Sequence, residues 1–232
     1  MKKRVLSMFL AVVMAICLLP TVAFADSIAG PSFATVYIGQ NYPASQSAVD
    51  FNSGGGGANT TSVEGLLPAG MYWIDVYSNE EVFRLSGTPQ PGTAGIYTVT
   101  GTCLTDNSYI DCELTVAKGS QTICVDDGTS TDVSAITIPI GTPYTLNAYS
   151  VDGSGNKIDI ATDYPSLTAA DHQPSYTYAS SNPGVATVDA SGVVTPMSRG
   201  TTTITINSAA TDSYNSTEKT ISLTVKAQPT II

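Results

Sequence analysis

The sequence YASSNPGVATVDASGVVTPMSRG, residues 178–200, decides the fold class, and the alternating TTTITI of residues 201–206 follows it directly. Asn182-Pro183-Gly184 predicts a turn, because proline presets one φ and glycine accepts the positive φ that side chains resist. A short strand over 185–188 follows, and a second turn at 189–192 leads into a strand over 193–195 that returns antiparallel to it. The segment has no helical period and therefore predicts antiparallel β-structure.

Composition extends this prediction to the whole chain. Threonine, valine, tyrosine, glycine and proline are abundant, whereas residues that favour helices are few, a balance typical of all-β proteins. A β-sandwich domain needs about 100 residues. The sequence therefore predicts two tandem β-sandwich domains, over residues 27–117 and 119–226, each large enough to bury a core without metal or dense disulfides.

The first 25 residues are predicted to be a cleaved signal peptide. Met1 to Arg4 carry three positive side chains, and the apolar run over 5–19 that follows is too short to span a bilayer. A small-x-small pattern places cleavage between Ala25 and Asp26. The remaining 207 residues are predicted to be exported to the cell surface or beyond it, and no later apolar run is long enough to insert into a membrane.

The net charge restricts the classes of partner. Three of the nine basic residues leave with the signal peptide while all nineteen acidic residues remain, so the net charge changes from −10 to −13. Nucleic acids and anionic membranes attract cationic surfaces. We therefore expect neither as a partner, and we expect the acidity to support solubility.

Three motifs in the first domain match a known pattern. They are LPAGM at 67–71, SGTP at 86–89 and GIYTV at 95–99. Together they resemble a family of Ig-like domains found in bacterial surface proteins, with the likeness extending over most of residues 27–117. The pattern departs at Cys103, where a cysteine occupies an ordinary strand position.

The second domain resembles another family. IGTPYTLNA at 140–148, the 178–206 block and ISLTV at 221–225 are similar to bacterial Ig-like domains of group 2, which occur in intimin- and invasin-type adhesins and in many secreted enzymes. Tyr178 stands where that family has tryptophan, so we expect it to be an aromatic core residue. The resemblance implies an Ig-like sandwich and extracellular display, and it implies no reaction.

A repeated seam connects the domains. LTVAKGSQTI at 114–123 ends one domain and opens the next, and LTVKAQPTI at 223–231 repeats it with one residue fewer. Residues 227–232 are therefore expected to be the start of a further repeat or a tail.

The cysteines predict one disulfide. Cys103 and Cys112 are expected on the last two strands of the first domain, paired through a hairpin at residues 106–108, and an exported chain favours oxidation; two buried free thiols are the alternative. Cys124 alternates with Ile123 and Val125. It is interpreted as a small buried apolar residue, with a reactive or intermolecular thiol as the alternative.

No catalytic, cofactor-binding or metal-binding residues are predicted. Residues 152–159, DGSGNKID, place oxygen donors at alternate positions, but a hairpin turn is favoured over a calcium loop because the closing glutamate is missing. His172, the single histidine, is expected to be exposed in a polar loop over 168–174. One histidine with the three scattered cysteines of the mature chain does not supply a zinc site. A Ser-His-Asp triad needs an oriented histidine and an oxyanion hole, and nothing near His172 resembles a nucleophile elbow.

Aromatic residues offer the remaining candidate contact. Trp73, Tyr72 and Tyr77 follow the LPAGM turn and are candidate rim residues for a glycan or protein of the host or the cell wall. The favoured function is a non-catalytic structural spacer or adhesion module of an exported surface protein. The alternatives are a glycan- or protein-binding module and an accessory region of a secreted hydrolase.

Overall fold

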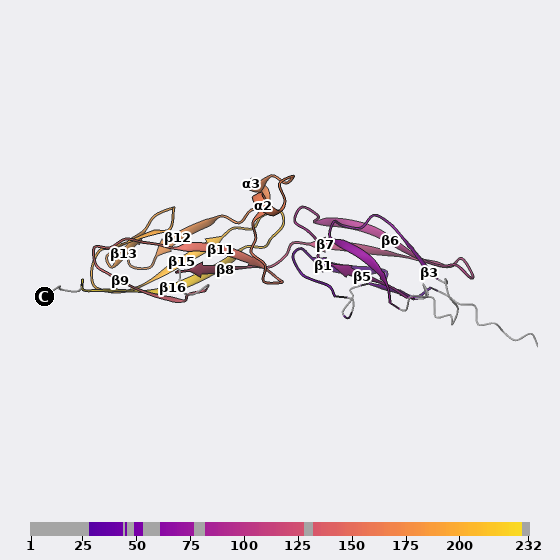
Figure 1. Ribbon diagram of the computed structural model, residues 1–232, viewed down its shortest axis with the longest axis horizontal. Helices are drawn as coiled ribbons and strands as arrows, with labels where there is room; N and C mark the ends of the chain where they lie inside the picture. Colours follow the sequence, from indigo (N-terminus) through magenta and orange to yellow (C-terminus); the bar gives the residue numbers. More distant parts are fainter. Residues whose placement is uncertain are drawn as a thin grey trace, which may run out of the picture.

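The computed structural model describes residues 28–43, 45, 49–52, 61–76, 82–127 and 132–228. These residues form two β-sandwiches placed end to end, with two one-turn helices at their junction (Figure 1). The all-β prediction is confirmed. The predicted signal peptide, its cleavage site at Ala25 and Asp26, and the last four residues lie outside the described ranges.

The first sandwich contains seven strands. They are β1 (Phe33–Tyr37), β2 (Asp50–Asn52), β3 (Thr61–Glu64), β4 (Met71–Asp75), β5 (Val82–Gly87), β6 (Gly95–Cys103) and β7 (Tyr109–Ala117). One sheet has the order β1-β7-β6-β3 and the other β2-β5-β4. Because side chains alternate along a strand, Val99 and Leu114 point inward from the first sheet and meet Phe51 and Leu85 from the second, and all four are fully buried.

The second sandwich contains nine strands. They are β8 (Gln121–Asp126), β9 (Ala135–Pro139), β10 (Tyr144–Thr145), β11 (Asn147–Asp152), β12 (Tyr176–Ser180), β13 (Ala186–Val188), β14 (Val193–Pro196), β15 (Gly200–Ser208) and β16 (Thr217–Lys226). The large sheet has the order β12-β15-β16-β9. The other layer consists of the two-stranded sheet β11-β8 and the three-stranded sheet β10-β14-β13. Its core is aliphatic, with Ile204, Ile206, Ile221 and Leu223 almost fully buried.

The larger sheets of the two sandwiches have equivalent strand orders. In each, an early strand runs parallel to the last strand, β1 beside β7 and β9 beside β16, while the other neighbours are antiparallel. The order β1-β7-β6-β3 therefore corresponds to β9-β16-β15-β12. This correspondence allows residues on the two outer faces to be compared position by position.

Residues 186–196 form the predicted hairpin. β13 and β14 pair antiparallel, and Gly192 at the turn between them has a φ of 78°. The earlier turn is built differently from the prediction: Gly184 is not in the left-handed region, and its N–H instead donates to the Asn182 side chain at 3.2 Å. Tyr178 packs against the second core, as expected, and burial raises its pKa.

Candidate functional site

The most distinctive feature of the structure is the joint between the two sandwiches. An insertion between β11 and β12 carries α2 (Ile160–Asp163) and α3 (Ala169–His172), and Figure 1 shows both helices at the junction. The sequence analysis predicted no helix here. The insertion lies against the loops of the first sandwich that follow β1 and β5.

Local hydrogen bonds shape this insertion. The Asp159 side chain caps α2 by accepting from the Thr162 N–H at 3.2 Å. Pro165 follows immediately after the helix, where it disfavours a further helical residue. The Gln173 side chain connects the end of the insertion to its beginning. It accepts from the Ile160 N–H at 2.7 Å and donates to the Ile158 carbonyl at 3.2 Å.

Apolar side chains continue the first core through the joint. Tyr214, in the loop between β15 and β16, is 2% exposed and Ile160 is fully buried. Both belong to the same buried cluster as Ile38 of the first sandwich, and the half-buried Tyr164 and Leu167 pack against it. The two sandwiches therefore share apolar surface that neither would bury alone.

Two glycines allow this close approach. A Cβ added to Gly92 would lie 2.8 Å from Leu167 Cδ2 of the insertion. A Cβ added to Gly119, in the linker, would lie 2.0 Å from the Ile38 carbonyl oxygen. At Gly119 the neighbouring atom belongs to the backbone and cannot change rotamer, and Gly92 has a φ of 81°, which side chains resist. The joint as built therefore favours glycine at both positions.

Hydrogen bonds cross the same interface. Ser154 Oγ donates to the Gly39 carbonyl at 2.8 Å and accepts from the Asn41 N–H at 3.0 Å. Ser213 Oγ, which is fully buried, accepts from the Gly92 N–H at 3.0 Å. These hydrogen bonds are directional and orient the two sandwiches relative to each other, whereas the apolar cluster removes apolar surface from water.

The linker is bonded along its length. Lys118 Nζ donates to the Thr211 carbonyl at 2.6 Å. The Gly119 N–H donates to the Ser213 carbonyl and the Gly119 carbonyl accepts from the Asn215 N–H, both at 2.9 Å. Residues 118–119 therefore form a short bridge to the second sandwich and do not behave as an unbonded tether.

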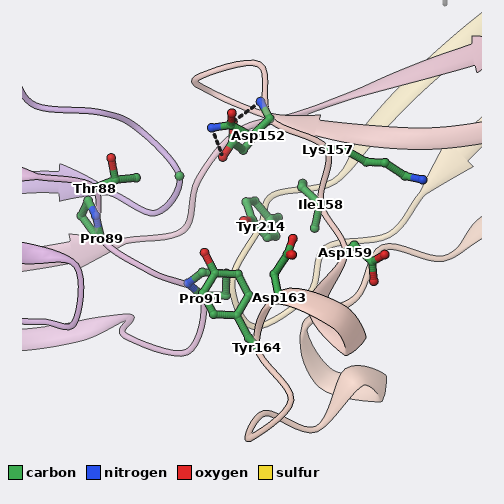
Figure 2. Close-up of a pocket in the computed structure, with 12 residues that line it drawn as sticks. Thr88, Pro89, Pro91, Asp152, Lys157, Ile158, Asp159, Asp163, Tyr164 and Tyr214 are labelled. Atoms are coloured by element: carbon green, nitrogen blue, oxygen red, sulfur yellow. Dashed lines mark hydrogen bonds between the residues drawn. The ribbon is translucent and has the colours of Figure 1, made fainter.

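A cavity of about 270 Å³ lies in the joint. Figure 2 shows its lining, with Tyr214 in the centre and the Lys157 side chain directed away from the other labelled residues. The lining comprises Gly39, Thr88, Pro89, Pro91, Asp152, Asn156, Lys157, Ile158, Asp159, Asp163, Tyr164 and Tyr214. The lining includes three carboxylates, a residue type that can bind metal ions or take part in acid–base chemistry.

Two of the three carboxylates already have local roles. Asp152 Oδ1 accepts from the Ser154 and Asn156 N–H groups, both at 2.9 Å, and so closes the turn that the sequence favoured over a calcium loop. Asp159 caps α2. Within the described ranges, no group of three or more His, Cys, Asp or Glu side chains could hold a metal ion.

The tyrosines of the cavity are poor proton donors. Burial raises the pKa of Tyr214 and the pKa of Tyr164. The negative charges of Asp163 and Asp152 raise the pKa of Tyr164 further. Both phenols therefore remain protonated and neutral around pH 7. The arrangement is suited to packing rather than to catalysis.

His172 differs from its predicted environment. It is half-buried, and its Nδ1 lies 2.7 Å from Ser213 Oγ, the same oxygen that accepts from Gly92. The expectation of an exposed loop residue is therefore wrong. Because Ser213 is fully buried, the pair offers no accessible nucleophile and instead adds to the joint.

The predicted disulfide is also wrong. Cys103 and Cys112 are not joined by a disulfide, and both are buried. The chain turns at 104–106, earlier than predicted, so the register places Cys112 opposite Val99 and bonds the Cys103 N–H to the Ser108 carbonyl. Four residues of strand correspond to about 13 Å, which a disulfide cannot bridge.

These thiols should be protected in the folded chain. Burial, and then the charge of Glu113, raises the pKa of Cys112, which keeps it as the unreactive thiol near neutral pH. We expect iodoacetamide to modify Cys103 and Cys112 only after unfolding, and we expect dithiothreitol to leave Tm unchanged. A non-reduced mass 2 Da below the reduced mass, or a fall in Tm on reduction, would contradict the free-thiol assignment.

Cys124 lies on the outer side of its strand. Ile123 and Val125 point into the second core, whereas Cys124 is half-buried and stands opposite Tyr149 in the β8–β11 pair. Its thiol pKa is raised, chiefly by desolvation and then by Asp132. It is therefore not the fully buried apolar residue that was expected.

Of the candidate aromatic residues, the two within the described ranges, Tyr72 and Trp73, do not lie on one face. Tyr72 is 54% exposed, whereas its neighbour Trp73 points to the opposite face of β4 and packs against Phe51, with ring centroids 5.6 Å apart. Tyr77 lies outside the described residues. Contact with a glycan or protein at these positions stays a prediction, and Trp73 has a packing role.

Comparison with known families supports the assignment of the second sandwich. A family model described as the intimin immunoglobulin-like domain matches residues 167–211, which include β12 to β15. This part of the chain resembles the immunoglobulin-like domain of intimin. The predicted resemblance to bacterial Ig-like modules is thereby confirmed.

Solved structures with tandem β-domains are also similar. Domains 4 and 5 of the S-layer protein SbsC match at 20% identity, covering 72% of this chain and 77% of that chain, with a TM-score of 0.35. Domains 4–9 of SbsC match at 18% identity and a TM-score of 0.38, covering 89% of this chain and 31% of that chain. Drosophila N-cadherin EC1-4 matches at 12% identity and a TM-score of 0.36, with 86% and 49% covered. No curated protein matches.

Across the described ranges, none of the helices has the length and apolarity needed to cross a membrane.

Proposed function

We propose that this chain is a structural spacer of an exported bacterial surface protein, in which two Ig-like sandwiches act as one stiff unit. The observation that carries the proposal is the buried cluster that joins Ile38 of the first sandwich to Ile160 and Tyr214 of the second. A flexible string of domains would not need such an interface, because domains joined loosely bury little surface against each other. The resemblance of residues 167–211 to an intimin domain supports display on a bacterial surface.

A fixed joint transmits orientation as well as distance. The apolar cluster resists separation, and the bonds of Ser154 and Ser213 resist rotation. In this proposal no residue of the chain performs a reaction and no cofactor is bound. The spacer would set a defined separation and angle between its two ends.

Small-angle scattering of a joint variant tests this proposal. Leu167→Asp places a carboxylate against Gly92 at the edge of the cluster, and burial of an unpaired charge is unfavourable. We expect the parent chain to scatter as a single elongated particle, and the variant to give a broader distance distribution while both sandwiches remain folded by circular dichroism. Identical distributions for the two proteins would contradict a rigid joint.

A further inference from the structure

The outer face of the β1-β7-β6-β3 sheet carries an unusual set of exposed side chains. Phe33 is 77% exposed, Ile96 68% and Tyr109 68%. These side chains occupy alternate positions to the buried core residues and point away from the sandwich. Isolated exposed apolar residues are ordinary, whereas a group on one face often marks a contact surface.

The strand register brings two of these residues into one patch. Phe33 lies beside Glu113, which lies beside Thr98. In the next row Ile96 lies beside Thr115. Phe33 and Ile96 flank β7, two strand spacings apart across the sheet and two residues apart along it, which corresponds to about 12 Å. Tyr109 lies further along β7 on the same face.

Negative charge surrounds the patch. Asp111 and Glu113 on β7 and Glu64 on β3 are exposed on this face. Strands β1, β3, β6 and β7 contain no lysine or arginine. Residues 27–117 contain eight acidic residues and a single basic one, Arg84, whose guanidinium forms an ion pair with Asp50 at 2.8 Å in the other sheet.

The second sandwich provides an internal comparison. By register, Phe33 corresponds to Ala135, Ile96 to Thr201, Glu113 to Ser222 and Tyr109 to Glu218. The same architecture therefore forms with small or polar residues at these positions. The fold itself does not require the apolar residues or the carboxylate of the first sandwich.

We propose that this acidic-apolar face, defined by Phe33, Ile96, Tyr109, Asp111 and Glu113, docks a polypeptide surface that carries lysine or arginine beside apolar side chains. Charge complementarity favours this occupant, because three nearby carboxylates attract a cationic partner. A second copy of the chain would bring the same carboxylates together and be repelled. A sheet face is also broad, which suits a polypeptide better than a small ligand.

The test is a selection from a random library of 12-residue peptides displayed on phage. The parent chain is the bait, and the variant Phe33→Ala/Ile96→Thr, which copies the second sandwich at both positions, removes binders to other surfaces. We expect the recovered peptides to be enriched in Lys or Arg together with apolar residues. A synthetic copy should bind the variant about tenfold more weakly than the parent.

Charge is tested separately with Asp111→Asn/Glu113→Gln. We expect it to weaken the peptide several-fold and to reduce the dependence of Kd on salt, while Thr203→Ser/Ser222→Ala, on the equivalent face of the second sandwich, should leave Kd unchanged. Grafting Ala135→Phe/Thr201→Ile/Ser222→Glu should create a second, weaker site.

Three outcomes would overturn the proposal. They are recovery of no peptide that distinguishes parent from variant, enrichment of acidic or neutral peptides, and a dimer in analytical ultracentrifugation that Phe33→Ala/Ile96→Thr abolishes. The last outcome would assign the face to a second copy. All variants must retain the parental circular dichroism spectrum for the comparison to count.

Discussion

Tyr214→Ala is expected to lower the free energy of unfolding by about 3–5 kcal/mol, the usual cost of removing a large buried aromatic side chain. Tyr214 is 2% exposed and belongs to the cluster that joins the two sandwiches. Its removal should leave a cavity between Ile38 and the insertion, so stability should be lost from both sandwiches. Tyr109→Ala, at a position 68% exposed, should change stability by no more than about 0.5 kcal/mol.

Trp73 makes the effect on the first sandwich measurable. It is the only tryptophan of the chain and packs against Phe51, in the first core. Unfolding in urea can be monitored by Trp73 fluorescence. The midpoint urea concentration should therefore fall when Tyr214, in a loop of the second sandwich, is replaced. An unchanged fluorescence transition, with loss confined to the circular dichroism of the second sandwich, would show that the cores are independent.

Gly119→Ala should have the second large effect. A Cβ at this position would lie 2.0 Å from the Ile38 carbonyl oxygen. Backbone atoms cannot avoid the clash by changing rotamer, so the linker must move away from the first sandwich. Overpacking of this kind costs about 1–3 kcal/mol, and here it should also open the joint.

Gly184→Ala provides the matched control for this variant. Its nearest neighbour would be Asn182 Oδ1 at 3.3 Å, and the position is not in the left-handed region. We expect a change within about 0.5 kcal/mol and an unaltered scattering curve. If Gly119→Ala and Gly184→Ala melt and scatter alike, the linker is not packed as the structure shows.

Local features of the fold were predictable because they depend on short-range patterns. The β13–β14 hairpin follows from turn residues and alternation within a few positions, and Tyr178 was assigned to the core from an aromatic residue in a known motif. Register was not predictable in the same way. Cys103 and Cys112 were assigned to the correct strands, but a turn displaced by a few positions moved Cys112 opposite Val99.

The joint could not be derived from either domain pattern alone. Its members lie far apart in the sequence, with Ile38, Gly92, Leu167 and Tyr214 contributed by four different loops or turns. One local signal was present: Ile158, Ile160, Tyr164 and Leu167 are apolar, and they lie between the end of the predicted hairpin turn at 152–159 and the predicted polar loop at 168–174. Such residues need a covering surface, and the first sandwich supplies it.

Residual dipolar couplings test the fixed joint most directly. Backbone N–H couplings of the two sandwiches, measured in one weakly aligned sample, report the orientation of each independently of the other. A rigid unit predicts one alignment tensor that fits β1–β7 and β8–β16 together, with the relative orientation seen in Figure 1. Tensors of clearly different magnitude for the two sandwiches would mean that they reorient separately and would contradict the rigid spacer.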